Sequence, residues 1–390
     1  MLTILKNGEV YAPEYLGKKD ILIVQNKIGY IKDKIELPPD FVDIEVIDAT
    51  GMILVPGFID SHVHITGGGG EGSYRTRTPE LYLSEATTSG ITTIVGVLGT
   101  DGTTRTMASL LAKARGLEEE GLTCYIHTGS YQTPVKTLTS KIEDDLILID
   151  KIIGVGEIAI SDHRSSQPTM EEIAKIASAA RVGGMLSGKA GIVNIHVGDG
   201  VGKLSLLKEV VEKTEIPITQ FHPTHINRNE QLFEAGIEYA KMGGYVDFTT
   251  SSVQKFISRG EVKSSKGLKR MLDSGVAIEQ ITFTSDGQGS LPEFNEKGEF
   301  IGLKVGKVSS LYQEVKDAIQ VEGISIETAF RVITSNPASI LKLHHKGRIK
   351  EGSDADIVVL EKDSLDLNTV FANGRLMVHN KQVIVKGTFE

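Results

Sequence analysis

Two histidines separated by one residue, His62 and His64, end an apolar stretch that begins at Gly57. In an extended strand, side chains two positions apart point to the same face, so the two imidazoles would lie side by side. Imidazole is a common protein ligand for zinc, and it binds the metal in its neutral form. If the chain supplies further ligands, the pair therefore indicates a metal site. If it does not, the pair is better explained as two ordinary core or surface histidines.

Further residues of the ligand type lie in or just after later apolar runs. They are Glu157, His196, His225 and Asp286. One metal needs three or four protein ligands, so a total of six is enough for two metals that share a bridging carboxylate. His127 also ends an apolar run, but the pattern gives it no partner, and we expect it only to line the site.

The apolar runs have a regular rhythm along the middle of the chain. Eight of them end near His64, Leu98, Thr128, Ile160, His196, His225, Thr249 and Ser285. Stretches with helical periodicity and capping residues lie between them, as at 103–120, 140–152, 169–181 and 229–242. Eight strand–helix units in about 230 residues predict a (β/α)8 TIM barrel, with its active site at the carboxyl ends of the strands. A doubly wound open sheet is the alternative, but it would normally have fewer strands.

Both ends of the chain are rich in β-forming residues instead. The candidate strands are 20–24, 27–31 and 44–47 near the start, and 357–360, 369–371, 375–378 and 383–385 near the end. Breakers such as Pro38-Pro39 and Asn373-Gly374 separate them. We predict one small β-sandwich domain built from residues 1–55 and 345–390, and a catalytic barrel of residues 56–344.

Composition excludes several classes of function. The chain has 390 residues, 24% of them charged, and a net charge of -9 without a basic run, so nucleic acid is not an expected partner. No apolar run approaches the roughly 20 residues that span a bilayer, so no membrane association is expected. Cys124 is the single cysteine and the N-terminus lacks the layout of a signal peptide, which favours a cytoplasmic location.

The ligand pattern resembles that of the amidohydrolase superfamily. The shared features are the His-x-His on the first barrel strand, one histidine on each of strands five and six, an aspartate on strand eight, and the segment 347–356 that returns to the small β-domain. Within the superfamily the resemblance narrows to the isoaspartyl (β-aspartyl) dipeptidases. It rests on segments 56–71, 98–101, 160–165, 223–229, 285–290 and 386–390, and extends over essentially the whole chain.

The resemblance implies a barrel of the metal-dependent hydrolase type that hydrolyses β-aspartyl dipeptides. Two divalent metal ions, expected to be Zn2+, would be bound by His62, His64, Glu157, His196, His225 and Asp286. A hydroxide bridging the metals would attack the isopeptide carbonyl, with Asp286 as general base and then acid, and Tyr131 as donor to the oxyanion. The expected substrate contacts are Gly69, Glu71, Thr100, Arg164, Arg228 and Ser290. Relatives of this kind also lead us to expect a homo-oligomer.

The fourth barrel strand departs from the family pattern. The family usually places a carboxylated lysine there to bridge the metals, whereas this chain has Glu157 and no lysine between Gly154 and Ile160. The glutamate side chain is shorter, so the strand must approach more closely. Compared with its counterpart in the family, the segment is one residue longer, and a β-bulge would supply the reach. If Glu157 did not bridge, a single-metal enzyme would follow.

Two other functions remain open from the sequence. One is an amidohydrolase that acts on cyclic amides or N-acyl amino acids, although a cyclic amide has no free ammonium group to pair with Glu71. The other is a non-catalytic, dihydropyrimidinase-like assembly protein. Proteins of that kind typically lose metal ligands, whereas every ligand position is filled here.

Overall fold

Eight parallel strands form the centre of the protein in this computed structural model, which describes residues 2–36, 44–295 and 300–390. The strands are β6 (Phe58–Val63), β7 (Ile91–Gly96), β8 (Thr123–Thr128), β9 (Ile152–Ile160), β10 (Ile192–Val197), β11 (Phe221–Thr224), β12 (Val246–Thr249) and β13 (Ile281–Thr284). Strands β6 to β11 pair in chain order, and β12 pairs with β13. All eight predicted strands are therefore present.

Main-chain contacts join the two sheets at both edges. The amide of Ile226, just past β11, donates to the carbonyl oxygen of Asp247 on β12 at 3.1 Å. At the other edge, Val63 bridges to Gly287, and the amide of His64 donates to the carbonyl oxygen of Gly287 at 2.9 Å. The strands thus close into a ring, which confirms the predicted barrel and excludes an open sheet.

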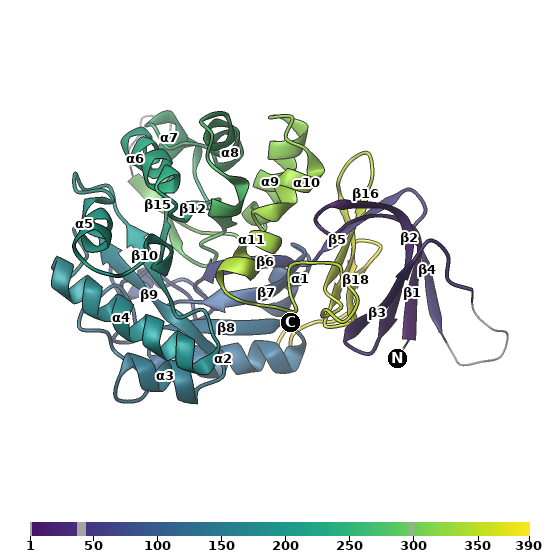
Figure 1. Cartoon of the computed structure of the whole chain (residues 1–390), viewed down its shortest axis with the longest axis horizontal. Coiled ribbons are helices and arrows are strands. Elements are labelled where there is room, and N and C mark those ends of the chain that lie inside the picture. The colour runs from purple at the N-terminus through teal and green to yellow at the C-terminus, as the bar shows by residue number, and fades with distance from the viewer. Residues whose placement is uncertain (1, 37–43, 296–299) are drawn as a thin grey trace.

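Helices cover the outside of the ring (Figure 1). They are α1 (Leu83–Thr87), α2 (Met107–Glu120), α3 (Ile142–Leu148), α4 (Met170–Ser187), α5 (Ser205–Lys213), α6 (Glu230–Lys241), α7 (Gln254–Ser258), α8 (Ser264–Asp273), α9 (Ser310–Gln320), α10 (Ile326–Arg331) and α11 (Ser335–Ile340). A capping box of Thr169 and Glu172 begins α4, and the Asn229 side chain caps α6. The helical stretch predicted at 140–152 is shorter than expected, because β9 already starts at Ile152.

Strands from both termini form a second sheet beside the barrel (Figure 1). They are β1 (Leu2–Tyr11), β2 (Tyr15–Val24), β3 (Lys27–Lys32), β4 (Glu45–Asp48), β5 (Met52–Pro56), β16 (Ile357–Glu361), β17 (Leu367–Ala372), β18 (Arg375–His379) and β19 (Gln382–Val383). All nine belong to one mostly antiparallel sheet, and the predicted last strand is only two residues long. The turn predicted at Pro38-Pro39 lies outside the described residues, and the division at residues 55 and 345 stays a prediction.

The two faces of this sheet pack against different cores. Along β16, Ile357 and Val359 join the core of the terminal sheet itself, with residues such as Leu54. Their neighbours Val358 and Leu360 instead join the large core of the barrel. This alternation is the period of two expected of a strand that is covered on both faces.

One end of the barrel is closed by apolar packing. Ala338 and Ile340 of α11, with Leu341, pack against residues at the amino ends of the strands, including Ile153 and Ile192. The opposite mouth is partly bordered by Ser290 and Leu291 at the start of β14 (Ser290–Phe294). This strand forms an antiparallel pair with β15 (Phe300–Val305) that the sequence did not predict. Among the described residues, no helix has the length and apolar character needed to cross a membrane.

A buried lysine ties the terminal sheet to the barrel. The Lys346 ammonium lies 2.6 Å from an oxygen of Asp356, 2.9 Å from one of Asp354 and 2.7 Å from the Thr123 hydroxyl at the start of β8. The Lys346 and Asp356 side chains are almost completely buried. A buried ion pair with additional hydrogen bonds is strongly destabilised by removal of one partner, because the other charge is left uncompensated.

We therefore expect Lys346→Met to lower the free energy of unfolding by about 3–5 kcal/mol. Lys362→Met is the matched control, since Lys362 pairs with Glu9 at the surface and is half exposed; its loss should change stability by less than about 1 kcal/mol. Chemical denaturation of both variants measures the difference. Equal denaturation midpoints for Lys346→Met and wild type would contradict this role of the buried lysine.

Candidate active site

Three of the predicted ligands gather where β6 and β13 end. The rings of His62 and His64 lie with centroids 5.6 Å apart, and the side chain of Asp286, just past β13, faces both. The Nε2 atom of His64 lies 3.0 Å from Oδ1 of Asp286, and that of His62 lies 3.8 Å from the same oxygen. Their ligand atoms all lie within 4.8 Å of one another, which suits a shared metal ion.

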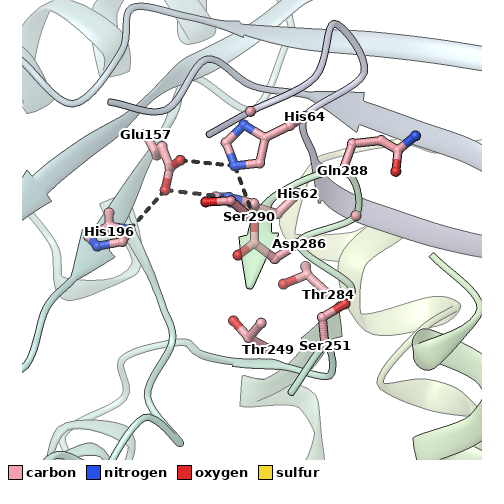
Figure 2. A network of polar contacts seen from close by, with 12 residues as sticks. His62, His64, Glu157, His196, Thr249, Ser251, Thr284, Asp286, Gln288 and Ser290 are labelled. Atoms are coloured by element: carbon pink, nitrogen blue, oxygen red, sulfur yellow. Dashed lines mark hydrogen bonds and ion pairs between the residues drawn. The ribbon is translucent and has the colours of Figure 1, made fainter. Parts of the chain in front are cut away.

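Glu157 on β9 lies between His64 and His196 (Figure 2). Its Oε1 lies 3.6 Å from Nε2 of His64. Its Oε2 lies 3.1 Å from Nδ1 of His196 on β10 and 3.9 Å from Nε2 of His225, just past β11. Oε2 also lies 3.4 Å from Nε2 of His62, so the carboxylate as a whole contacts histidines of both halves of the cluster, as a bridging ligand would.

The donor set fits divalent metal ions. Three buried atoms, His62 Nε2, Glu157 Oε1 and Asp286 Oδ1, make no hydrogen bond to any described residue. Buried polar atoms are normally satisfied, and coordination to a cation would satisfy all three. Imidazole nitrogens with two carboxylates are the ligand types that zinc and similar metals prefer.

Charge compensation keeps the central carboxylate ionised. Burial raises the pKa of Glu157, but the opposite effect of His62, His196 and His225 is larger. The pKa of Glu157 therefore lies well below its usual value. For His62, burial lowers the pKa, and the facing carboxylates of Glu157 and Asp286 raise it to about 10. Without metal, the protonated imidazole thus supplies the positive charge that the buried carboxylates need.

A β-bulge delivers Glu157 to the cluster. Along β9 and β10, Val155 pairs with Val193 and Ile158 pairs with Ile195, so Gly156 and Glu157 together face Asn194. This is the additional residue inferred from the sequence. Gly156 has φ of 138°, and a Cβ atom there would lie 2.5 Å from the carbonyl oxygen of Asn194. Only glycine fits this conformation and this close approach.

Two ligands follow their strands in a left-handed backbone conformation. His225 has φ of 65° and Asp286 has φ of 52°. This region is uncommon for residues other than glycine, although histidine and aspartate are enriched in it. Such outliers concentrate at functional sites, where the surrounding structure holds them.

Several residues that support the ligands were not identified from the sequence. Asn194 Oδ1 lies 3.1 Å from Nδ1 of His62, and Asp247 on β12 accepts hydrogen bonds of 2.6 Å from the hydroxyls of Thr224, Thr282 and Thr284. A further contact that supports the site is the hydrogen bond of 3.1 Å from the Ser285 amide to Asp60. The sequence could indicate only that these polar residues alternate with apolar ones and face the inside of the barrel. The pairing of the strands is needed to show which residues they contact.

His127 does not line the site as expected. It is fully buried inside the barrel and does not border the cavity at the barrel mouth. Burial lowers its pKa to about 3, so the ring is neutral. It therefore belongs to the interior packing beneath the ligands.

A cavity of about 540 Å³ opens above the ligands at the carboxyl ends of the strands. All six predicted substrate contacts border it, as does the predicted catalytic residue Tyr131; the six are Gly69, Glu71, Thr100, Arg164, Arg228 and Ser290. The sequence missed other residues of its wall, including Asp199, Asn229, Phe256, Arg259 and Glu261. Tyr131 is close to the ligand cluster, with its hydroxyl 2.8 Å from Nδ1 of His196.

Opposite charges lie next to one another on the cavity wall. Glu71 Oε1 lies 3.4 Å from Nη1 of Arg164 and 3.1 Å from the Thr100 hydroxyl. The Ser290 hydroxyl lies 3.5 Å from the other oxygen of Glu71. Arg228 contributes a second guanidinium, whose buried Nε makes no hydrogen bond to any residue of the described ranges.

Known proteins match both the sequence and the fold. The amidohydrolase family model matches residues 53–389. The chain is 45% identical to the β-aspartyl dipeptidase of the thermophilic, keratin-degrading Fervidobacterium islandicum AW-1 in its crystal structure with the dipeptide β-Asp-Leu; the match has a TM-score of 0.91 and covers 98% of this chain and 97% of that chain. A second structure of that enzyme gives 44% identity and a TM-score of 0.89, over 98% of both chains. The dihydroorotase of Listeria monocytogenes serotype 4a is 26% identical over 95% of this chain and 92% of its own length.

The bulge leads to a prediction about metal binding. We expect Gly156→Ala to displace Glu157, because the new Cβ would collide with the Asn194 carbonyl, and to lower the metal bound per chain. Gly116→Ala in α2 is the matched control, because nothing lies within 4 Å of a Cβ there. Elemental analysis of the purified variants, with thermal unfolding as a check on folding, measures the effect. Wild-type metal content in folded Gly156→Ala would show that the bulge is dispensable.

Proposed function

We propose that this chain, which belongs to the amidohydrolase family and within it to the β-aspartyl dipeptidases, is a metal-dependent hydrolase that cleaves β-aspartyl (isoaspartyl) dipeptides. The observation that carries the proposal is the adjacent Glu71 and Arg164 pair, with Oε1 and Nη1 3.4 Å apart on the wall of the cavity above the ligand cluster. The Fervidobacterium enzyme, 45% identical, was crystallised with β-Asp-Leu.

The chemistry of the substrate explains why such a pair is useful. An isoaspartyl residue keeps its α-ammonium and α-carboxylate on one carbon, because the peptide bond is formed through the side chain. Glu71 would accept hydrogen bonds from the ammonium, and Arg164 would donate to the neighbouring carboxylate. The two protein groups pair with each other in the free enzyme, so neither charge is left uncompensated before substrate binds.

The second residue of the dipeptide carries another carboxylate. Arg228 is the expected partner, since it borders the same cavity and its buried Nε makes no hydrogen bond to a described residue. A guanidinium can bind a carboxylate through two parallel hydrogen bonds. Gly69, Thr100 and Ser290 border the cavity near Glu71 and would add hydrogen bonds to the substrate.

The ligand cluster would hold two divalent metal ions, which we propose to be zinc. His62, His64 and Asp286 would bind one, His196 and His225 the other, and Glu157 would contact both. When bound, the metals would make an activated water available near neutral pH and polarise the scissile carbonyl. With a bridging glutamate, the carboxylated lysine usual in this family is not required.

Two side chains would act on the reacting atoms. Burial raises the pKa of Asp286, but His64, His225 and His62 lower it to about 2, so the carboxylate is ionised and can accept the proton of the attacking water. It would then deliver that proton to the leaving amine. Burial raises the pKa of Tyr131 well above its usual value, which keeps its hydroxyl protonated as a donor to the developing oxyanion.

The alternatives fit the cavity less well. A cyclic amide or an N-acyl amino acid lacks the free ammonium that Glu71 would bind, so that carboxylate would gain no partner. A non-catalytic assembly protein would not need six converging ligands and a cavity above them. A cytoplasmic location is part of the proposal and rests on the sequence, whose single cysteine, Cys124, is buried and unpaired. A homo-oligomeric assembly is also part of it and rests on the resemblance to the family.

The direct test compares β-Asp-Leu with α-Asp-Leu. We expect wild type to prefer the β-linked dipeptide by on the order of a hundredfold or more in kcat/KM, since displacing the scissile carbonyl by ~1 Å can cost about 10²-fold. Asp286→Asn should lower kcat by about 10²–10⁴-fold, because it cannot accept the proton. No preference for the β-linked dipeptide would refute the proposed substrate.

The ammonium contact has its own test. We expect Glu71→Gln to lower kcat/KM for β-Asp-Leu by about 10–100-fold, as loss of a hydrogen bond to a charged group costs roughly 1.5–3 kcal/mol. N-acetyl-β-Asp-Leu, which lacks the ammonium, should be a poor substrate for wild type and should be affected much less by this substitution. An equal loss on both substrates would contradict the pairing of Glu71 with the ammonium.

A further inference from the structure

The carboxylate of Asp162 holds Arg164 in place from one side. Asp162 lies two residues past the end of β9, and its side chain is 4% exposed. Its Oδ1 accepts from Nε of Arg164 at 2.9 Å and its Oδ2 accepts from Nη2 at 2.8 Å, which is a bidentate pair. The Arg164 amide also donates to Oδ1 at 2.8 Å. One edge of the guanidinium is thereby fixed.

The same carboxylate contacts a metal-ligand histidine. Oδ2 of Asp162 lies 3.0 Å from Nε2 of His196. A carboxylate oxygen accepts here, so this hydrogen bond requires the hydrogen on Nε2, and a metal would then be bound through the lone pair of Nδ1. Nδ1 is the nitrogen that faces Glu157 Oε2, at 3.1 Å. With a metal ion held beside Glu157, Asp162 would thus favour the tautomer whose Nδ1 is free to bind that ion.

Arg164 and His196 both also contact Tyr131. The Arg164 guanidinium lies over the ring of Tyr131, with its central carbon 5.3 Å from the ring centroid. The Tyr131 hydroxyl lies 2.8 Å from Nδ1 of His196. The edge of Arg164 that Asp162 does not hold is directed to Glu71, through Nη1. One buried carboxylate therefore lies at the junction of the ligand cluster and the substrate cavity.

We propose that Asp162 is a positioning residue that couples the two parts of the site: it holds His196 in its metal-binding tautomer and Arg164 in its substrate-binding orientation. The proposal rests on the proposed function. Its geometric basis is that Oδ2 alone accepts from both side chains, Arg164 and His196. A displacement of this one carboxylate would alter both at once.

A purely structural role of Asp162 can be separated from this one. The turn after β9 is held by the main-chain carbonyl of Asp162, which accepts from the Ser165 amide at 3.1 Å and from the Gln167 side chain at 2.9 Å. Asp162→Asn retains that carbonyl and the shape of the side chain. It removes the charge, and it leaves a single acceptor oxygen where two are needed.

The experiment combines a double-mutant cycle with a metal titration. Asp162→Asn, Arg164→Gln and the double variant are assayed on β-Asp-Leu, and Zn2+ binding to metal-depleted wild type and Asp162→Asn is measured by calorimetry. Asp150→Asn is the control, because that carboxylate pairs with Arg115 at the exposed surface at 2.9 Å. Thermal unfolding shows whether each variant is folded.

We expect Asp162→Asn to raise KM about tenfold or more alone but by less than about twofold in the Arg164→Gln background, because coupled residues are not additive. Of the two Zn2+ sites, we expect the weaker one to lose about 10–100-fold in affinity in Asp162→Asn. This is the usual effect of losing a carboxylate that hydrogen-bonds to a histidine ligand. Asp150→Asn should change neither. KM effects that multiply in the double variant, or wild-type Zn2+ affinity in Asp162→Asn, would overturn the proposal. If wild type failed to cleave β-Asp-Leu, the proposed function would be wrong. The Zn2+ titration would still decide whether Asp162 positions His196.

Discussion

The structure depends on placing one ionised carboxylate, Glu157, in a fully buried position. A buried charge is tolerated only when opposite charge and hydrogen bonds compensate for the lost hydration. Here the compensation comes from histidines on or just past three other strands, His62, His196 and His225, so the barrel must close for the site to exist. Metal ions would supply the same positive charge more strongly. The requirement for compensation is thus the physical reason why these ligands and this fold occur together.

The rest of the barrel meets this requirement. The bulge at Gly156 brings the short glutamate side chain within reach of the histidines, and the inward-facing polar residues Asn194 and Asp247 hold the strands and rings beneath it. Apolar packing by α11 closes the far end of the barrel, so the cavity opens only above the ligands. The terminal sheet is attached at the amino end of β8 through Lys346, away from the reacting groups.

Much of this could be predicted from the sequence. Periodicity identified the eight strands, and the rule that barrel sites lie at the carboxyl ends of strands assembled His62, Asp286 and the other ligands before any contact was known. The substrate contacts, such as Glu71, came from resemblance to a family and not from spacing, yet they border the cavity.

Other features could not be predicted because they depend on pairing between distant segments. Asn194 is an ordinary inward-facing polar residue until the register places it against His62 and opposite Gly156. The contact of Asp162 with His196 likewise requires the loop after β9 to meet strand β10. His127 ends a strand as the ligands do, and only the packing shows that it lies below the cavity.

The proposed mechanism requires Glu157 to bind two metal ions. The most direct measurement is a crystal structure of the zinc-loaded protein with anomalous diffraction data collected at the zinc absorption edge. We predict two anomalous peaks, one beside His62, His64 and Asp286 and the other beside His196 and His225, with one oxygen of Glu157 at each. A single peak, or two peaks without contact to Glu157, would contradict the account.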